Sequence, residues 1–151
     1  MSLLEVSGLK KVYKTRFGGN AVEALRNVNF SVSEGEYVAI MGESGSGKTT
    51  LLNILAALDK PTAGTVLLDG RDFTKIRESE AATFRRDHLG FVFQEFNLLD
   101  TFTLEDNIYL PLVLAGKSYD EMRTRLIDIA ETLGIRELLK KYPYEVSGGQ
   151  K

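Results

Sequence analysis

The sequence contains no cysteine and no tryptophan, and it has only three prolines in 151 residues. Without cysteine the chain has no disulfide, no thiolate nucleophile and no zinc-thiolate site, which is typical of proteins in a reducing compartment such as the cytoplasm. The first residues, MSLLEVSGLKKVY, also lack a long apolar run and carry lysines after a short apolar patch. This pattern is neither a signal peptide nor a membrane-spanning helix, so we expect any role at a membrane to depend on a partner.

Charge of one sign is not in excess either. Nineteen basic and 21 acidic residues give a formal net charge of −2, and the two kinds are interleaved along the chain. A nucleic-acid partner would require a basic surface, so we expect no nucleic acid to bind. The 43% content of apolar residues is enough to bury the core of one globular domain.

Two kinds of apolar pattern predict strands. Residues 4–12 and 28–32 alternate apolar and polar side chains, which predicts two half-buried strands joined by an exposed hairpin-like connection over 14–22. Residues 37–41 (YVAIM) and 89–93 (LGFVF) are continuous apolar runs. Such runs predict strands covered on both faces, as in a parallel core sheet.

Helical periodicity follows each apolar run. Residues 49–58 repeat apolar side chains at helical spacing, 76–87 are charged and predicted helical, and 103–142 read as a mostly α-helical segment. The start and stop signals of that last segment are the capping-box pairs Thr103–Asp106 and Ser118–Glu121 and the terminal glycines Gly116 and Gly134. Alternation of strands and helices predicts an α/β protein.

The segment GESGSGKT, residues 42–49, matches the phosphate-binding pattern G-x-x-x-x-G-K-[ST] at every position. Phosphate recognition needs several backbone N–H groups to converge on one anion, and glycines permit that close approach. The helix that follows adds its positive end, Lys48 adds a charge for the β- and γ-phosphates, and the Thr49 hydroxyl can bind Mg²⁺. The residues predicted to bind the nucleotide here are Gly42, Ser44, Gly45, Ser46, Gly47, Lys48, Thr49 and Thr50.

A flexible glycine-serine turn before a lysine would be the bland interpretation of this loop, but a buried strand before it and an amphipathic helix after it favour a P-loop. The P-loop alone leaves kinases, GTPases, helicases and transporter ATPases open.

Three further features make the whole chain resemble the ATP-binding-cassette (ABC) ATPases, and they occur along the chain in the order found in that family. Phe91-Val92-Phe93-Gln94 is similar to the strand that ends in the Q-loop glutamine. Val146-Ser147-Gly148-Gly149-Gln150 is similar to the signature LSGGQ, with valine in place of leucine. Tyr13 matches the A-loop aromatic residue of the family.

The resemblance implies a role for each of these residues, with ATP and Mg²⁺ as cofactors. Lys48 and Gln94 have catalytic roles, and Thr49 and Gln94 hold the metal. Tyr13 stacks on adenine. The signature residues Ser147, Gly148 and Gly149 cap the γ-phosphate held by the P-loop of a second copy, in a head-to-tail dimer.

The implied fold is a P-loop NTPase of the α/β class with an N-terminal antiparallel β-subdomain, a partial parallel core sheet and an α-helical subdomain. Residues 1–102 form the ATP-binding core, with the P-loop at 42–49 and the Q-loop residue at 94. Residues 103–145 form the helical subdomain, and 146–151 begin the signature. The family's Walker B strand, D-loop and switch histidine do not follow, so we expect a partial sequence, with the C-terminal part of the domain missing, that binds ATP but hydrolyses it negligibly.

The stretches around the P-loop and the signature are similar to the macrolide-exporter, lipoprotein-releasing and peptide-antibiotic exporter group. This implies an ATPase on the inner face of the cell membrane that drives export or extraction by a separate permease. Candidate permease contacts are Phe96, Leu98 and Leu99. A regulatory or cell-division ABC module is the alternative, while a soluble kinase would have no use for the signature. The lone histidine, His88, is expected to be structural.

Overall fold

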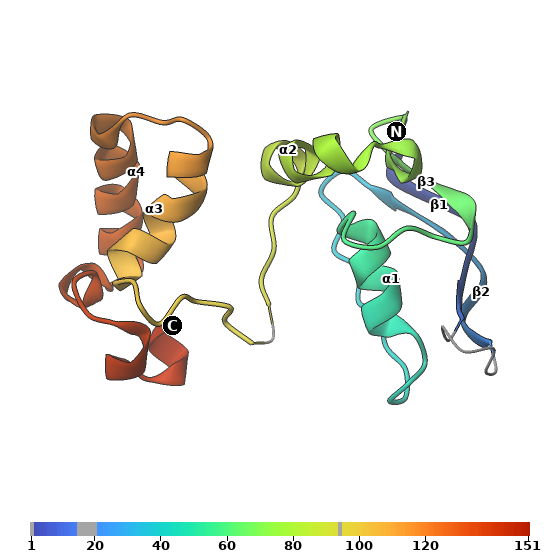
Figure 1. Cartoon of the computed structure of the whole chain (residues 1–151), viewed down its shortest axis with the longest axis horizontal. Helices are drawn as coiled ribbons and strands as arrows, with labels where there is room; N and C mark the ends of the chain where they lie inside the picture. Colours follow the sequence, from blue (N-terminus) through green and yellow to red (C-terminus); the bar gives the residue numbers. More distant parts are fainter. Residues whose placement is uncertain (1, 15–20, 94) are drawn as a thin grey trace. The chain divides into compact units, whose positions relative to one another are not determined.

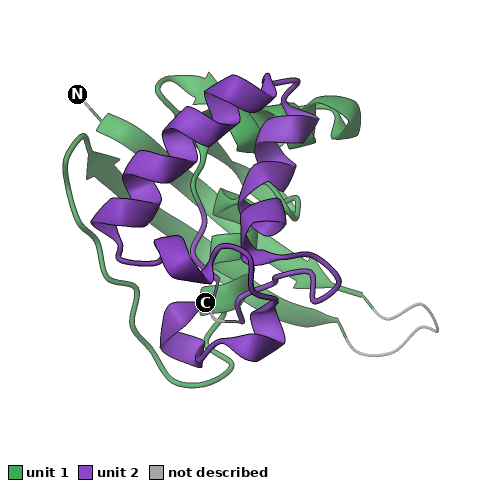
Figure 2. Ribbon diagram, turned by 90° about the vertical axis from the view of Figure 1, so that its left-hand side faces the viewer, with its two compact units in different colours: residues 1–90 green, residues 91–151 purple. Residues whose placement is uncertain are grey.

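The computed structural model describes residues 2–14, 21–93 and 95–151. The chain divides into two compact units, Met1–Gly90 and Phe91–Lys151, which Figure 2 shows in green and purple. Residues 91–102 thus group with the second unit. The domain division proposed from the sequence, at residues 102 and 145, stays a prediction. Most of the predicted hairpin-like connection, residues 15–20, lies outside the described residues.

The first unit contains a four-stranded sheet. Its strands are β1 (Ser2–Tyr13), β2 (Val22–Ser33), β3 (Ala63–Leu68) and β4 (Arg71–Asp72), in the spatial order β2-β1-β3-β4, and every pair is antiparallel. The long β1–β2 pair runs from Ser2 opposite Ser33 to Tyr13 opposite Val22. The antiparallel β-subdomain expected from the alternating pattern is therefore confirmed (Figure 1).

Three helical segments complete this unit: α1 (Lys48–Leu55), the 3-10 turn η1 (Phe73–Lys75) and α2 (Glu78–His88). Leu51 and Ile54 of α1 are buried against the sheet in one apolar cluster, and Figure 1 shows α1 alongside the strands. The members of the cluster are Val6, Leu9, Leu25, Leu51, Ile54, Val66, Phe73, Ile76, Ala81 and Phe84. Because α1 packs on the sheet by one face, the loop before it is held at the edge of a rigid body.

The two predicted buried strands, 37–41 and 89–93, are wrong for the described residues. Neither segment forms a strand, and no parallel strand pair occurs in the part of the chain that the structure describes. Tyr37, Met41 and Val92 expose 95%, 88% and 102% of their surface. An apolar run becomes a strand only when a neighbour satisfies its backbone N–H and C=O groups, and no described strand lies beside either run.

The second unit contains α3 (Leu104–Leu114) and α4 (Tyr119–Thr132), followed by the 3-10 turns η2 (Arg136–Leu138), η3 (Pro143–Glu145) and η4 (Gly148–Gln150). Thr103 forms the predicted capping box with Asp106, whereas the Ser118 side chain only accepts the Glu121 N–H. The core of this unit consists of Tyr109, Met122, Leu126, Ala130 and Leu139. No helix formed by the described residues combines the length and apolar character needed to cross a bilayer.

Candidate functional site

The P-loop curls directly into the N-terminus of α1. Gly45 and Gly47 have φ angles of 81° and 91°, in the left-handed region that glycine adopts most easily. The Ser46 N–H donates to the Glu43 carbonyl at 3.2 Å, which closes a turn. A Cβ on Gly42 would lie 2.7 Å from the Ser46 Oγ, so the two ends of the turn approach each other closely. The loop is thus tightly curved, as phosphate binding requires.

Backbone N–H groups in this loop lack partners. Among the described residues, the N–H groups of Gly45, Gly47, Lys48, Thr49 and Thr50 have no hydrogen-bond acceptor. Gly47 is the N-cap of α1 and supplies no side-chain cap, and the first turn of the helix holds no acidic residue. The positive end of α1 is therefore uncompensated, which suits an anion such as a phosphate group.

The Lys48 ammonium folds back over this loop. Its Nζ donates to the carbonyl oxygens of Gly42 at 2.7 Å and Glu43 at 2.6 Å. The Ser46 Oγ lies 3.3 Å away. A full positive charge is thereby held beside the free N–H groups. Thr49, in the first turn of α1, is exposed, so its hydroxyl is free to meet a metal ion at the loop.

The loop also packs against β2. A Cβ on Gly47 would lie 2.4 Å from the Ala24 carbonyl oxygen, so only a glycine allows this approach. Ala24 is two residues from Val22, which is the cross-strand partner of Tyr13. The structure therefore brings the phosphate loop to the end of the β1–β2 pair where the predicted adenine-binding residue lies.

Tyr13 is held by two residues that the sequence analysis missed, Lys11 and Asp59. The Tyr13 hydroxyl donates to the Asp59 Oδ2 at 2.9 Å, and the Lys11 Nζ lies 4.8 Å from the centroid of the Tyr13 ring. Lys11 also pairs with the Asp59 Oδ1 at 2.6 Å. Lys11 and Tyr13 are two apart on one strand and so share a face, which is a signal that the sequence offers. Asp59 lies 46 residues from Tyr13, and no local pattern connects them.

The Asp59 carboxylate is stabilised in its charged form. Partial burial alone would raise the pKa of Asp59, but hydrogen bonds from Lys11, Tyr13 and the Lys60 N–H outweigh it and hold the pKa below its ordinary value. Asp59 is therefore a carboxylate at neutral pH, with its two oxygens shared among three donors.

The remaining predicted site residues lie in the second unit. Gln94 lies outside the described residues. The Ser147 N–H and hydroxyl both donate to the Gln150 Oε1, at 3.0 and 3.1 Å, at the start of η4. The Phe96 ring lies beside the signature, since a Cβ on Gly148 would be 3.7 Å from its Cζ. Leu99 is 45% exposed and Leu98 is half-buried.

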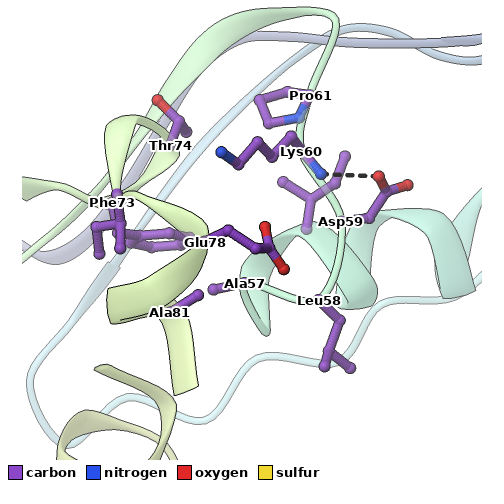
Figure 3. Close-up of a pocket in the computed structure, with 11 residues that line it drawn as sticks. Ala57, Leu58, Asp59, Lys60, Pro61, Phe73, Thr74, Glu78 and Ala81 are labelled. Atoms are coloured by element: carbon purple, nitrogen blue, oxygen red, sulfur yellow. Dashed lines mark hydrogen bonds between the residues drawn. The ribbon is translucent and has the colours of Figure 1, made fainter. Parts of the chain in front are cut away.

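A hollow of about 180 Å³ lies in the first unit beside the end of α1 (Figure 3). Its lining includes Asp59, Lys60, Phe73, Thr74 and Glu78, and none of the predicted phosphate-binding residues. The Lys60 N–H donates to Asp59 at 2.7 Å, drawn as a dashed line in Figure 3. This hollow is therefore separate from the predicted phosphate-binding loop. His88 packs on Phe84 in the same unit, with ring centroids 4.9 Å apart.

Comparison with protein families finds a match to the sequence model described as "ABC transporter" over residues 25–151. Among curated proteins, the chain is 50% identical over its whole length to YvcR, an uncharacterised ABC transporter ATP-binding protein of Bacillus subtilis (strain 168). It is 46% identical, again over its whole length, to the bacitracin export ATP-binding protein BceA of Halalkalibacterium halodurans. The chain spans 58% of YvcR and 59% of BceA.

A solved structure shares the fold. The dimeric structure of MJ0796, described as a bacterial ABC transporter cassette, matches with a TM-score of 0.86 and 38% identity. The match covers 97% of this chain and 64% of that one. A second MJ0796 structure, a post-hydrolysis state bound to ADP and Pi, gives the same TM-score at 39% identity. The predicted P-loop NTPase class is thereby confirmed.

Proposed function

Because this chain belongs to the ABC transporter family, we propose that it is the ATP-binding part of a transporter whose substrate is moved by a separate membrane permease. The observation that carries the proposal is the P-loop, where free N–H groups and the Lys48 ammonium meet at the positive end of α1. Such an arrangement favours the binding of phosphate groups.

In this proposal different residues of the chain bind different parts of the nucleotide. Lys48 and the N–H groups of the P-loop neutralise the β- and γ-phosphates, and the exposed Thr49 hydroxyl holds Mg²⁺ together with Gln94. The ring of Tyr13 carries the adenine. Bound Mg²⁺ would supply positive charge that offsets the negative charge developing during hydrolysis.

The signature residues act on a second copy of the chain. Ser147, Gly148 and Gly149 cap the γ-phosphate held by the partner's P-loop in a head-to-tail dimer, as we infer from the family and from the likeness to a dimeric cassette. In the described residues, the N–H groups of Gly148 and Gly149 have no acceptor, which suits an incoming anion. Dimer closure around two nucleotides would then be the step that transmits force to the permease.

For the substrate we propose an antimicrobial peptide, since BceA is a bacitracin export protein and is 46% identical to this chain. Macrolides and lipoproteins are the other substrate classes of the exporter group that the sequence resembles. The whole protein would work on the inner face of the membrane, with Phe96, Leu98 and Leu99 toward the permease. We propose ATP hydrolysis for the whole protein, because the chain spans only 58% of YvcR and 59% of BceA.

The first test is nucleotide binding with Lys48→Met. Charged hydrogen bonds of this kind contribute about 1.5–3 kcal/mol, so the affinity for MgATP should fall about 10- to 150-fold. The matched control is Lys75→Met, which removes an exposed lysine paired with Asp72 away from the loop. Equal affinities of the Lys48→Met and Lys75→Met variants in equilibrium dialysis would refute the phosphate site.

The second test addresses transport. The whole protein should co-purify with a permease that raises its rate of ATP hydrolysis, measured as released phosphate. Co-purification with a soluble division or regulatory protein instead would favour the non-transport module. Transfer of the γ-phosphate to an acceptor molecule would favour a kinase and contradict the proposal.

A further inference from the structure

The ring of Tyr13 is fixed by a closed set of polar contacts. The Lys11 Nζ donates to the Asp59 Oδ1 at 2.6 Å and to the Lys60 carbonyl at 2.7 Å, and it lies 4.8 Å from the centroid of the Tyr13 ring. Two of the three N–H donors of the ammonium group are thus used in hydrogen bonds, and its charge lies over the ring. On the other side of the carboxylate, the Asp59 Oδ2 accepts the Tyr13 hydroxyl at 2.9 Å. The ring is thus held at its hydroxyl and on one face.

The loop that carries Asp59 is itself anchored to β1. The Thr62 Oγ1 accepts the Val12 N–H at 2.9 Å, and the Thr62 N–H donates to the Lys10 carbonyl at 2.8 Å. These bonds hold the residues after α1 along the end of the strand that bears Tyr13. Asp59 therefore has a fixed position relative to the ring, rather than being a surface carboxylate that meets it by chance.

Only part of the ring remains open. The side chain of Lys11 is 12% exposed, whereas Tyr13 is 42% exposed. A planar ring has two faces, and the Lys11 ammonium occupies one of them. We infer that a nucleotide base would stack on the other face.

Building on the proposed function, we propose that Lys11 and Asp59 are positioning residues that hold Tyr13 as a one-sided platform for the base of the nucleotide. The charge of Lys11 is neutralised by Asp59, so we expect neither residue to contribute to binding of the phosphates. Their effect should therefore fall on recognition of the base and leave recognition of the phosphates unchanged. A merely structural role would weaken both alike.

The test compares two probes, ATP and inorganic tripolyphosphate, by equilibrium dialysis on the 151-residue chain. The quantity of interest is the Kd for tripolyphosphate divided by the Kd for ATP, which isolates the contribution of the nucleoside to binding. Tyr13→Ala removes the platform and should lower this ratio about 5- to 150-fold, the range that base stacking on an aromatic ring gives. Lys11→Met and Asp59→Asn should each lower it about 3- to 10-fold, because the ring stays but loses its fixed orientation.

Matched controls make the same changes of charge elsewhere in the first unit. Lys10→Met removes a lysine on the neighbouring residue of β1, where it pairs with Glu23 at 2.9 Å. Asp72→Asn removes a carboxylate of the same unit that is bonded to Thr74. Both variants should leave the ratio unchanged. Tyr13→Phe, which keeps the ring and removes only the hydroxyl, should reproduce the effect of Asp59→Asn.

A double variant separates positioning from general damage to the fold. Lys11→Met added to Tyr13→Ala should have no further effect on the ratio, since no ring remains to be positioned. If Tyr13→Ala lowers the ratio but Lys11→Met and Asp59→Asn leave it unchanged, the positioning role is wrong and the proposed function stands. If Tyr13→Ala itself leaves the ratio unchanged, the base site in the proposed function is wrong as well.

Discussion

The contact between Gly47 and β2 allows a sharp prediction about stability. In Gly47→Ala the new Cβ would lie 2.4 Å from the Ala24 carbonyl oxygen and 3.0 Å from a methyl group of Leu25. In Gly45→Ala the new Cβ would meet nothing within 4 Å, although the backbone is left-handed at both positions, with φ of 91° and 81°. The two variants therefore share the cost of the left-handed backbone and differ in the clash alone.

The magnitude follows from these two costs. A left-handed conformation costs a residue other than glycine roughly 1–2 kcal/mol, so Gly45→Ala should lower the free energy of unfolding of the first unit by about that amount. In Gly47→Ala the loop must also move by about 1 Å to restore an ordinary contact, and forced shifts of this kind cost about 1–3 kcal/mol. The total for Gly47→Ala is then about 2–5 kcal/mol. The loss of unfolded-state entropy on adding a methyl group is the same in both variants and cancels in the comparison.

Urea denaturation followed by far-UV circular dichroism measures both values. Because two units can unfold separately, hydrogen exchange of peptides from β1 and β2 assigns the transition to the first unit. Equal destabilisation by Gly45→Ala and Gly47→Ala would show that Gly47 does not pack on Ala24. The placement of the P-loop against the β1–β2 pair would then be wrong.

Two further predictions concern stability. The lowered pKa of Asp59 means that the Asp59 carboxylate stabilises the first unit above its ordinary pKa of 3.8, and that this contribution is lost as the pH falls through the folded-state value. Between about pH 6 and about pH 3, the free energy of unfolding measured in urea should therefore fall less for Asp59→Asn than for the unchanged chain. An identical fall would contradict the hydrogen bonds from Lys11, Tyr13 and Lys60 to Asp59. In the second unit, Thr103→Ala removes a complete capping box and should cost about 1 kcal/mol, whereas Ser118→Ala removes one 3.3 Å bond and should cost less. The reverse order in thermal melts would count against the observed caps.

Local chemistry explains which parts of the fold the sequence predicts well. The P-loop, the cap at Thr103 and the helix ends at Gly116 and Gly134 depend on a few neighbouring residues, and the structure shows all of them, with φ of 72° and 66° at the two glycines. The runs 37–41 and 89–93 are different. An apolar run has the composition that is typical of a strand. Whether it forms one depends on pairing with a neighbouring strand, which no local pattern describes.

The tyrosine platform could be predicted only in part. Tyr13 follows from the resemblance, and Lys11 shares its strand face, but Asp59 reaches Lys11 across 48 residues. Arg85 is a similar case. The sequence indicates a solvated helix face there, whereas the guanidinium donates to the Ala57 carbonyl at 2.9 Å, just beyond the end of α1. Contacts made by long side chains across a fold leave no periodic trace in the sequence.

Helix α1 connects the two parts of the proposed nucleotide site. Its N-terminus presents the free N–H groups of the P-loop, and the residues after its C-terminus carry Asp59, which holds the Tyr13 hydroxyl. Eight helical residues span about 12 Å, and burial of Leu51 and Ile54 fixes this length of helix on the sheet. In the proposed function, recognition of the phosphates and of the base therefore both depend on this one helix of the first unit.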